Sequence, residues 1–119
     1  MPRPSKCRVV STIPDAVDFK PRGIPMRDLQ EVYLPVDGFE AVRLTDLAGL
    51  EQGEAARRMG ISRQTFGRIL ASARRTIARA LVHGMALRIL GGHYEVRPTG
   101  GDSAVGRTKN SSEPEETNP

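Results

Sequence analysis

Apolar and polar positions alternate most regularly between residues 52 and 81. Ala55, Ala56 and Met59 share one face of a short predicted helix, which Gly60 would end, and Ser62 offers a capping hydroxyl to a second helix. Beyond Ser62, apolar residues recur at steps of three and four, which is the period of one helical face. This pattern predicts a helix-turn-helix whose second helix buries Phe66, Ile69, Leu70, Ala73, Ile77, Ala80 and Leu81 and ends at Gly84.

A supporting helix is predicted before this pair, from Asp37 to Ala48. Asp37 and Glu40 have the spacing of a capping box, and Gly49 would stop the helix. We expect Glu40 and Asp46 to be solvated, with weak surface pairing to arginine as the alternative. The apolar face that this helix would add to the core consists of Phe39, Val42, Leu44, Leu47 and Leu50.

Short extended segments are predicted on both sides of the helices. Five prolines forbid a long helix in residues 1–25, where 8–10 and 16–19 are able to form strands. After the long helix, two strand-like runs flank Gly91 and Gly92. A glycine pair between two such runs predicts a β-hairpin.

Together these elements predict a mainly α-helical fold: a helix-turn-helix with a small C-terminal β-hairpin and an extended N-terminal arm. We divide the chain into a basic arm (1–25), the helix-turn-helix domain with its hairpin (26–97) and a polar tail (98–119), whose composition predicts disorder. Two interpretations of the arm stay open. It tracks phosphates or lies in a minor groove of DNA, or it covers the helical core as a strap.

The charge of the chain is unevenly distributed. The net charge is +4, yet residues 55–94 hold eight arginines and no Asp or Glu, whereas residues 27–54 hold seven acids and two arginines. A local positive field of this kind favours binding of a polyanion. A genome biased towards arginine codons would explain arginine in place of lysine, but it would not explain the absence of acids.

The face of the second helix opposite Phe66 carries the residues that we expect to bind DNA. Arginine can read guanine, and glutamine can read adenine, through paired hydrogen bonds in the major groove. Base contacts are assigned to Arg63, Gln64 and Arg68. Phosphate contacts are assigned to Arg57, Arg58, Ser62, Thr65 and Arg75. The alternative interpretation is a two-helix hairpin whose charged face is only solvated.

No set of residues predicts catalysis, so we expect a protein that is not an enzyme. The chain has two histidines and one cysteine, without the paired spacings of a metal site, and no catalytic, metal or cofactor site is predicted. The single cysteine, Cys7, fits a reducing cytoplasm. Because no apolar run is long enough for a membrane span, we expect a cytoplasmic protein without a membrane partner.

Two resemblances follow from these motifs. Residues 54–81, EAARRMGISRQTFGRILASARRTIARAL, resemble the helix-turn-helix of sigma-factor region four, which recognises a promoter element. A longer resemblance is to UPF0251, a prokaryotic family of small uncharacterised proteins usually labelled as predicted DNA-binding proteins. It is carried, in order, by the stretches MPRPSKCR, DFKPRGIPMRDLQEV, VDGFEAVRLTDLAGLEQGEAARRMGISRQTFGRIL and ALVHGMALRILGGHYE. The resemblance implies DNA binding and indicates no operator, ligand or regulon.

The sequence therefore predicts sequence-specific binding of double-stranded DNA by a transcriptional regulator. A homodimer is a further expectation, because one short helix reads few base pairs. The main alternative is a protein-interaction module that docks on RNA polymerase or another transcription component through the acidic segment 28–54. A third alternative is RNA binding, but aromatic residues make up only 4% of the chain and leave little for stacking on unpaired bases.

Overall fold

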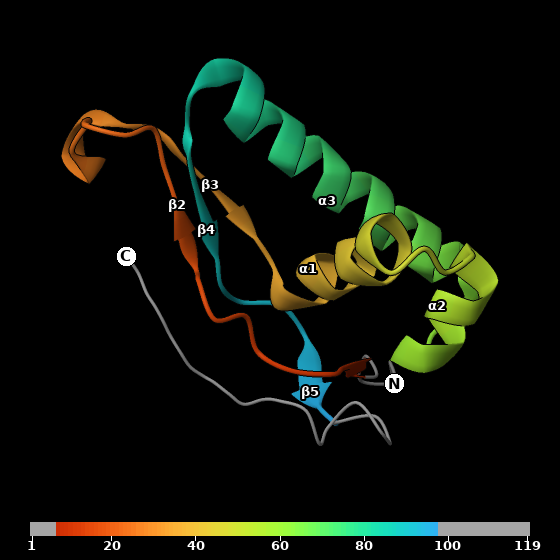
Figure 1. Cartoon of the computed structure of the whole chain (residues 1–119). Helices are drawn as coiled ribbons and strands as arrows, with labels where there is room; N and C mark the ends of the chain where they lie inside the picture. Colours follow the sequence, from red (N-terminus) through yellow and green to blue (C-terminus); the bar gives the residue numbers. More distant parts are fainter. Residues whose placement is uncertain (1–6, 98–119) are drawn as a thin grey trace, which may run out of the picture.

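A computed structural model describes residues 7–97 of the chain (Figure 1). Roughly half of these residues are helical, and the remainder include five short strands in two small sheets, so the fold is α/β and not mainly α as predicted. The elements, in chain order, are β1 (Arg8–Val10), β2 (Asp18–Phe19), the 3-10 turn η1 (Met26–Asp28), β3 (Glu31–Leu34), α1 (Val36–Val42), the π-helical turn η2 (Arg43–Leu47), α2 (Gln52–Met59), α3 (Arg63–His83), β4 (Ala86–Ile89) and β5 (Tyr94–Val96).

The predicted C-terminal hairpin is wrong, because β4 and β5 belong to different sheets. β4 is the central strand of the order β2-β4-β3, antiparallel to β2 and parallel to β3, so both of its edges are occupied. Gly91 and Gly92 do turn the chain, with φ of 81° and 100°. However, the carbonyl of Gly91 accepts a hydrogen bond of 3.0 Å from the Val36 amide at the start of α1, which directs β5 away from β4.

β5 pairs instead with β1, in parallel, at the other end of the chain. The Arg8 amide donates to the His93 carbonyl at 3.0 Å, and the Arg97 amide donates to the Val10 carbonyl at 2.8 Å. Residues 8–19 thus lie against the fold through β1 and β2, as the strap interpretation of the arm expects. The arm residues 1–6 and the predicted disordered tail, 98–119, lie outside the described residues.

α3 is the element that joins the two parts of the core (Figure 1). Its first half packs with α1, η2 and α2 around a cluster of Ala41, Leu44, Ala55, Ala56, Met59, Phe66 and Leu70. Its middle, through Ala73, packs on the strands around Val10, Leu34, Val36 and Ile89. Leu81 was expected in this core but is 81% exposed, because α3 extends beyond α1 and its last turn has no helix beside it.

The predicted ends of α2 and α3 are confirmed, whereas the predicted start of α1 is wrong. Gly60 and Gly84 end the two helices with φ of 71° and 64°, and the Ser62 Oγ accepts a hydrogen bond of 3.0 Å from the Thr65 amide. α1 begins at Val36, one residue before the expected start, and no side chain caps it. The α-helix ends at Val42 and continues as the π-helical turn to Leu47.

Candidate nucleic-acid interface

The turn between α2 and α3 is held by backbone hydrogen bonds and by a buried apolar contact. The Gly60 amide donates to the Arg57 carbonyl and the Ile61 amide to the Ala56 carbonyl, both at 3.1 Å. Met59 and Phe66, on either side of the turn, are fully buried. These contacts fix the direction in which α3 leaves the turn, so the outward face of α3 has a defined orientation.

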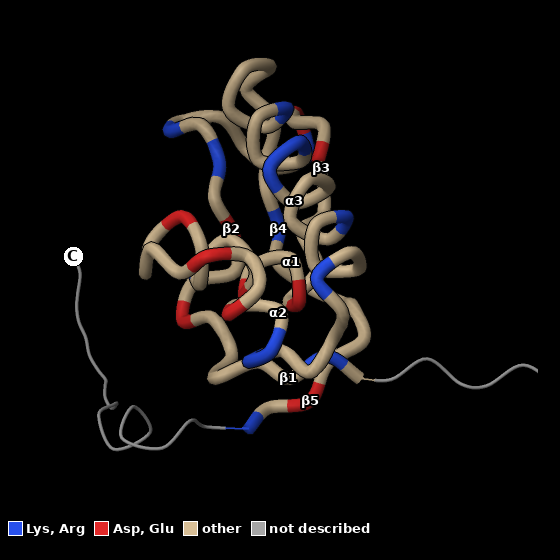
Figure 2. The backbone as a smooth tube through the Cα atoms, turned by 90° about the vertical axis from the view of Figure 1, so that its right-hand side faces the viewer, with Lys and Arg blue, Asp and Glu red and all other residues tan. Residues whose placement is uncertain are grey.

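The outward face of α3 carries the base-reading residues predicted from the sequence. Arg63, Gln64 and Arg68 are exposed, and so is Arg75, two helical turns after Arg68. They are not covered by other described parts of the chain, which the DNA-binding hypothesis requires. Figure 2 shows Lys and Arg residues following α3, with Asp and Glu gathered beside it around α1 and α2.

The arginines of α2 and α3 divide into two groups by their ion pairs. Among the described residues, three are held by carboxylates: Arg57 and Arg58 by Glu54, and Arg74 by Asp46. No carboxylate of residues 7–97 lies within ion-pair distance of the other four, which are Arg63, Arg68, Arg75 and Arg79. These four are hereafter called the unpaired arginines.

Three of the unpaired arginines share one stripe of α3. Arg75 follows Arg68 by seven residues and Arg79 follows Arg75 by four, so their side chains point to the same side at intervals of about 10 Å and 6 Å along the axis. Arg79 was missed in the sequence analysis. The spacing of four from Arg75 was the signal that could have found it.

The pairs formed by Arg74 and Arg57 also perturb the carboxylates that they contact. Arg74 donates from Nε to Asp46 Oδ2 at 3.0 Å and from Nη2 to Asp46 Oδ1 at 2.6 Å, and these hydrogen bonds lower the pKa of Asp46. The hydrogen bond from Arg57 lowers the pKa of Glu54 in the same way. Both carboxylates are therefore charged at neutral pH. Their ion pairs are exposed, so another anion can replace the carboxylate beside Arg57 or Arg74 at little cost in free energy.

Ser62 and Thr65, predicted to contact phosphate, are engaged with each other. The Ser62 hydroxyl donates to the Thr65 Oγ1 at 3.0 Å while its oxygen caps α3. Their hydroxyls therefore have a structural role at the start of α3. Contact of either residue with phosphate remains a prediction.

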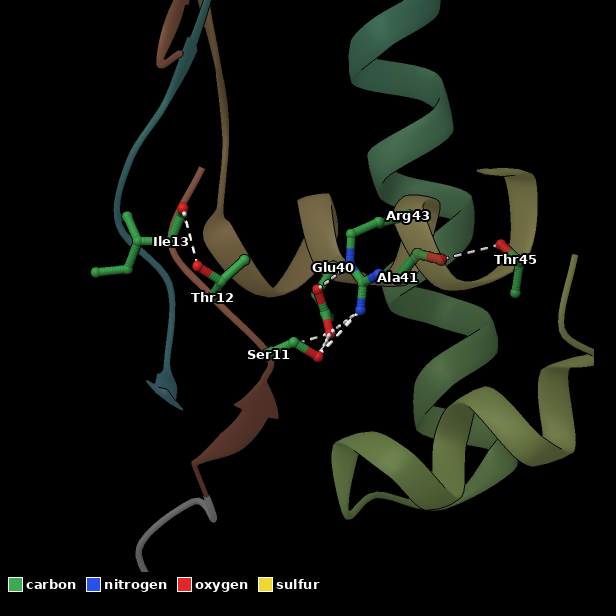
Figure 3. Close-up of polar contacts among 7 residues, drawn as sticks. All are labelled: Ser11, Thr12, Ile13, Glu40, Ala41, Arg43 and Thr45. Carbon is green, nitrogen blue, oxygen red and sulfur yellow. Dashed lines mark hydrogen bonds and ion pairs between the residues drawn. The ribbon is translucent and has the colours of Figure 1, made fainter. Parts of the chain in front are cut away.

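A buried polar network that the sequence analysis missed holds α1 in place (Figure 3). Glu40 was expected in solvent but is 2% exposed. Its carboxylate accepts hydrogen bonds of 3.1 Å and 3.0 Å from the amide and the hydroxyl of Ser11, and of 2.9 Å and 3.0 Å from Nε and Nη2 of Arg43. Since Ser11 follows β1 directly, the network fixes β1 against the helix that supports α3.

The acidic segment 28–54, the docking surface of the alternative hypothesis, is mostly engaged within the fold. Five of its seven acids have intramolecular ion pairs or hydrogen bonds, and two of them, Asp37 and Glu40, are buried. The five are Glu31, Asp37, Glu40, Asp46 and Glu54. The segment therefore does not present a continuous row of unpaired carboxylates.

Residues 7–97 offer neither a metal-binding cluster nor a membrane-spanning helix. This part of the chain contains no group of three or more His, Cys, Asp or Glu side chains arranged to hold a metal ion. Of the helices described here, none combines the length and apolar character that a membrane span requires.

Comparison with known proteins relates all of the described residues to one family. The family described as "Protein of unknown function DUF134" matches residues 1–97. A "UPF0251 protein" of Desulfosudis oleivorans is 57% identical over 105 residues, which is 88% of this chain and 75% of the relative. The chain belongs to the UPF0251 (DUF134) family.

Other UPF0251 relatives give the same picture. Proteins of Pelotomaculum thermopropionicum and Thermoanaerobacter pseudethanolicus are each 55% identical over 96 residues, which cover 81% of this chain and 73% and 81% of the relatives. No solved structure matches the chain. The names of these UPF0251 proteins state no function, so a function must be argued from the geometry above.

Proposed function

We propose that this protein binds double-stranded DNA sequence-specifically, as a transcriptional regulator, with α2 and α3 acting as a helix-turn-helix. The observation that carries the proposal is the row of unpaired arginines on the outward face of α3. Exposed arginine on a rigid helix suits both forked contacts to guanine and contacts to phosphate. Residues 55–94 contain no Asp or Glu, and the neighbouring carboxylates Asp46 and Glu54 pair with other arginines, so the unpaired arginines keep their positive charge without a local counter-charge.

The geometry suggests a division of α3 between bases and backbone. α3 has 21 residues and is about 31 Å long. Because the major groove curves around the duplex, only the first turns of a straight helix of this length can lie within the groove. In the proposal, Arg63, Gln64 and Arg68 face base edges. Arg75 and Arg79, farther along the helix, face phosphates together with Arg57, Arg58, Ser62 and Thr65.

Selection of bound duplexes from a random pool tests the sequence preference. We expect one recovered motif of a few base pairs, repeated with two-fold symmetry if the protein binds as a dimer. In that motif, Arg68→Ala should relax the preference at one position by about 1–3 kcal/mol while other positions keep theirs. Recovery of unenriched sequence, with binding that is insensitive to salt, would contradict the proposal.

Arg75 and Arg74 provide a matched pair for the phosphate contacts. They are adjacent on the same helix, but only Arg74 is held by a carboxylate. Arg75→Ala should weaken binding to all duplexes alike and flatten the slope of log affinity against log salt by about 0.9. Arg74→Ala removes the same charge and should have the smaller effect. Equal effects of the two substitutions would argue for a diffuse charge effect and against a defined contact.

The structure gives less support to docking on RNA polymerase through segment 28–54. Asp46 and Glu54 are occupied by arginines, and Glu40 is buried. A pull-down of polymerase without DNA, lost on Asp28→Asn and Glu51→Gln substitution, would favour that alternative. Competition between duplex DNA and duplex RNA separates the proposed function from RNA binding.

A further inference from the structure

The turn that carries Asp46 is fixed against α3. This turn, η2, continues α1, and the Thr45 Oγ1 donates a hydrogen bond of 2.9 Å to the Ala41 carbonyl. Leu44, in the same turn, is buried in one cluster with Phe66 of α3. The backbone around Asp46 is therefore held at one place beside the helix that carries the unpaired arginines.

Asp46 holds the paired arginine of α3. The helix contains five arginines, and among the ion pairs of residues 7–97 only the pair of Arg74 with Asp46 involves α3. Arg74 donates to both carboxylate oxygens, from Nε at 3.0 Å and from Nη2 at 2.6 Å. Two parallel contacts fix the plane of the guanidinium as well as its position. The pair therefore neutralises the charge of Arg74 and turns its side chain towards η2.

Arg74 also lies away from the side of α3 that the proposed function places on DNA. Successive residues of a helix are about 100° apart, so Arg74 points about 100° away from Arg75. Arg75 shares its stripe with Arg68 and Arg79. When this stripe faces a duplex that is bound through its base pairs, Arg74 lies at the flank of the interface. A charge at that position adds little to a complex whose orientation is fixed by base contacts.

Binding to non-specific DNA depends on charge in a different way. Without base contacts the helix has no fixed orientation on the duplex, and the affinity depends on how many phosphates the positive side chains neutralise. Any arginine that is exposed and unpaired adds to this binding. A carboxylate that holds Arg74 therefore lowers non-specific affinity more than it lowers specific affinity.

We propose that Asp46 is a specificity-determining residue, which keeps Arg74 from binding the phosphates of non-specific DNA. The inference rests on the proposed function, because it concerns how the same helix discriminates between sequences. Asp46 acts through Arg74 and is a positioning residue, since it contacts no base itself. The side chains of Arg74 and Asp46 are 52% and 40% exposed, so the effect of their pair on affinity is limited to a few-fold.

Asp46→Asn removes the charge that holds Arg74 and keeps the size of the side chain. Affinity for a random-sequence duplex in 0.1 M salt should rise roughly three- to fivefold. The slope of log affinity against log salt should steepen by about 0.9, because one more phosphate is contacted. Affinity for the duplex recovered by selection should rise less than about twofold, so the ratio of the two affinities should fall. Asp46→Glu retains the carboxylate and should keep the ratio of the unmodified chain.

The matched control is Asp28→Asn, which removes the same charge from η1. Asp28 forms no ion pair with any other residue of 7–97, and η1 lies far from the start of α3 (Figure 1). Asp28→Asn should change the ratio of the two affinities much less than Asp46→Asn does. Equal changes from the two substitutions would overturn the inference and leave DNA binding intact.

A double variant tests whether the effect passes through Arg74. In a protein that carries Arg74→Ala, adding Asp46→Asn should no longer steepen the salt slope, because no arginine is released. A slope that steepens equally without Arg74 would overturn the inference, although the chain would still bind DNA. Absence of DNA binding by the unmodified chain at low ionic strength would overturn the proposed function together with the inference.

Discussion

Arg74 and Arg75 are neighbours in the chain but face different surroundings. A helix turns by about 100° per residue, and this turn brings Arg74 to Asp46 while Arg75 faces solvent. Whether an arginine on α3 is paired therefore depends on its position relative to Asp46 of η2. Residue type alone does not reveal that difference.

The Arg74–Asp46 pair predicts a pH effect. Arg74→Ala should raise the pKa of Asp46 back to its usual range, which NMR titration of its carboxyl carbon would measure. Because the folded-state pKa is lowered, the stabilisation is present at neutral pH and is lost as pH falls through that pKa, below about pH 4. The pair is exposed, so its loss should change unfolding free energy by at most about 1 kcal/mol. An unchanged Asp46 pKa would contradict the pairing.

Gly92 is the residue at which a methyl group should do most harm. A Cβ there would lie 2.8 Å from Asp37 Oδ1 and 3.0 Å from Pro35 Cβ, at a φ of +100° that favours glycine. Gly92→Ala should lower the free energy of unfolding by at least about 2 kcal/mol in denaturant titrations. Gly53→Ala is the control, because nothing lies within 4 Å and a helical alanine should raise stability by up to about 1 kcal/mol.

At the scale of elements, α1 depends on a charge buried between it and the residues that follow β1. Glu40→Gln keeps the side-chain size but leaves Arg43 without its counter-charge, so we expect a loss of about 3 kcal/mol in unfolding free energy. The control, Glu54→Gln, removes a carboxylate from exposed pairs and should barely move the denaturation midpoint. Similar midpoints for the two variants would show that the network does not stabilise the fold.

The elements also show which features could be predicted from the sequence. The boundaries of α2 and α3 depend on local signals, namely Gly60, the Ser62 cap and apolar spacing, and these were predicted correctly. The partners of the strands could not be predicted in this way. A glycine pair indicates a turn, but the pairing of β4 depends on β2 and β3, which reach its two edges from distant parts of the chain.

The same limit applies to the candidate site. The exposed positions of Arg63, Gln64 and Arg68 follow from the helical period. Arg74 and Asp46, which form an ion pair, are 28 residues apart in the sequence. The buried carboxylate of Glu40 is hydrogen-bonded by Ser11, which is 29 residues away. Such pairings exist only in the folded chain, so the sequence analysis placed Glu40 in solvent.

At the scale of the whole molecule, the β1–β5 sheet closes the fold by joining its two ends. Val10 and Val96 are register partners, but Val10 is fully buried and Val96 is 43% exposed. Val10→Ala should therefore lower the unfolding free energy by about 2–3 kcal/mol, and Val96→Ala by much less. Chemical denaturation followed by circular dichroism would measure both. Equal losses of unfolding free energy in the two variants would mean that the β1–β5 sheet stabilises the fold through strand pairing alone and not through packing of Val10 in the core.

Because β1 and β5 are parallel, the chain enters β1 at one end of this two-stranded sheet and leaves β5 at the other, and β1 lies beside the α2–α3 turn through Val9. If the chain binds DNA as proposed, a purification tag or fluorescent protein joined before β1 would crowd an approaching duplex and lower its measured affinity. A dye for binding assays belongs on the loop around Arg22, and a tag should be cleaved before titration. An accessory module joined before β1 in a longer protein would lie next to the same turn, where it could cover or enlarge the surface of α3.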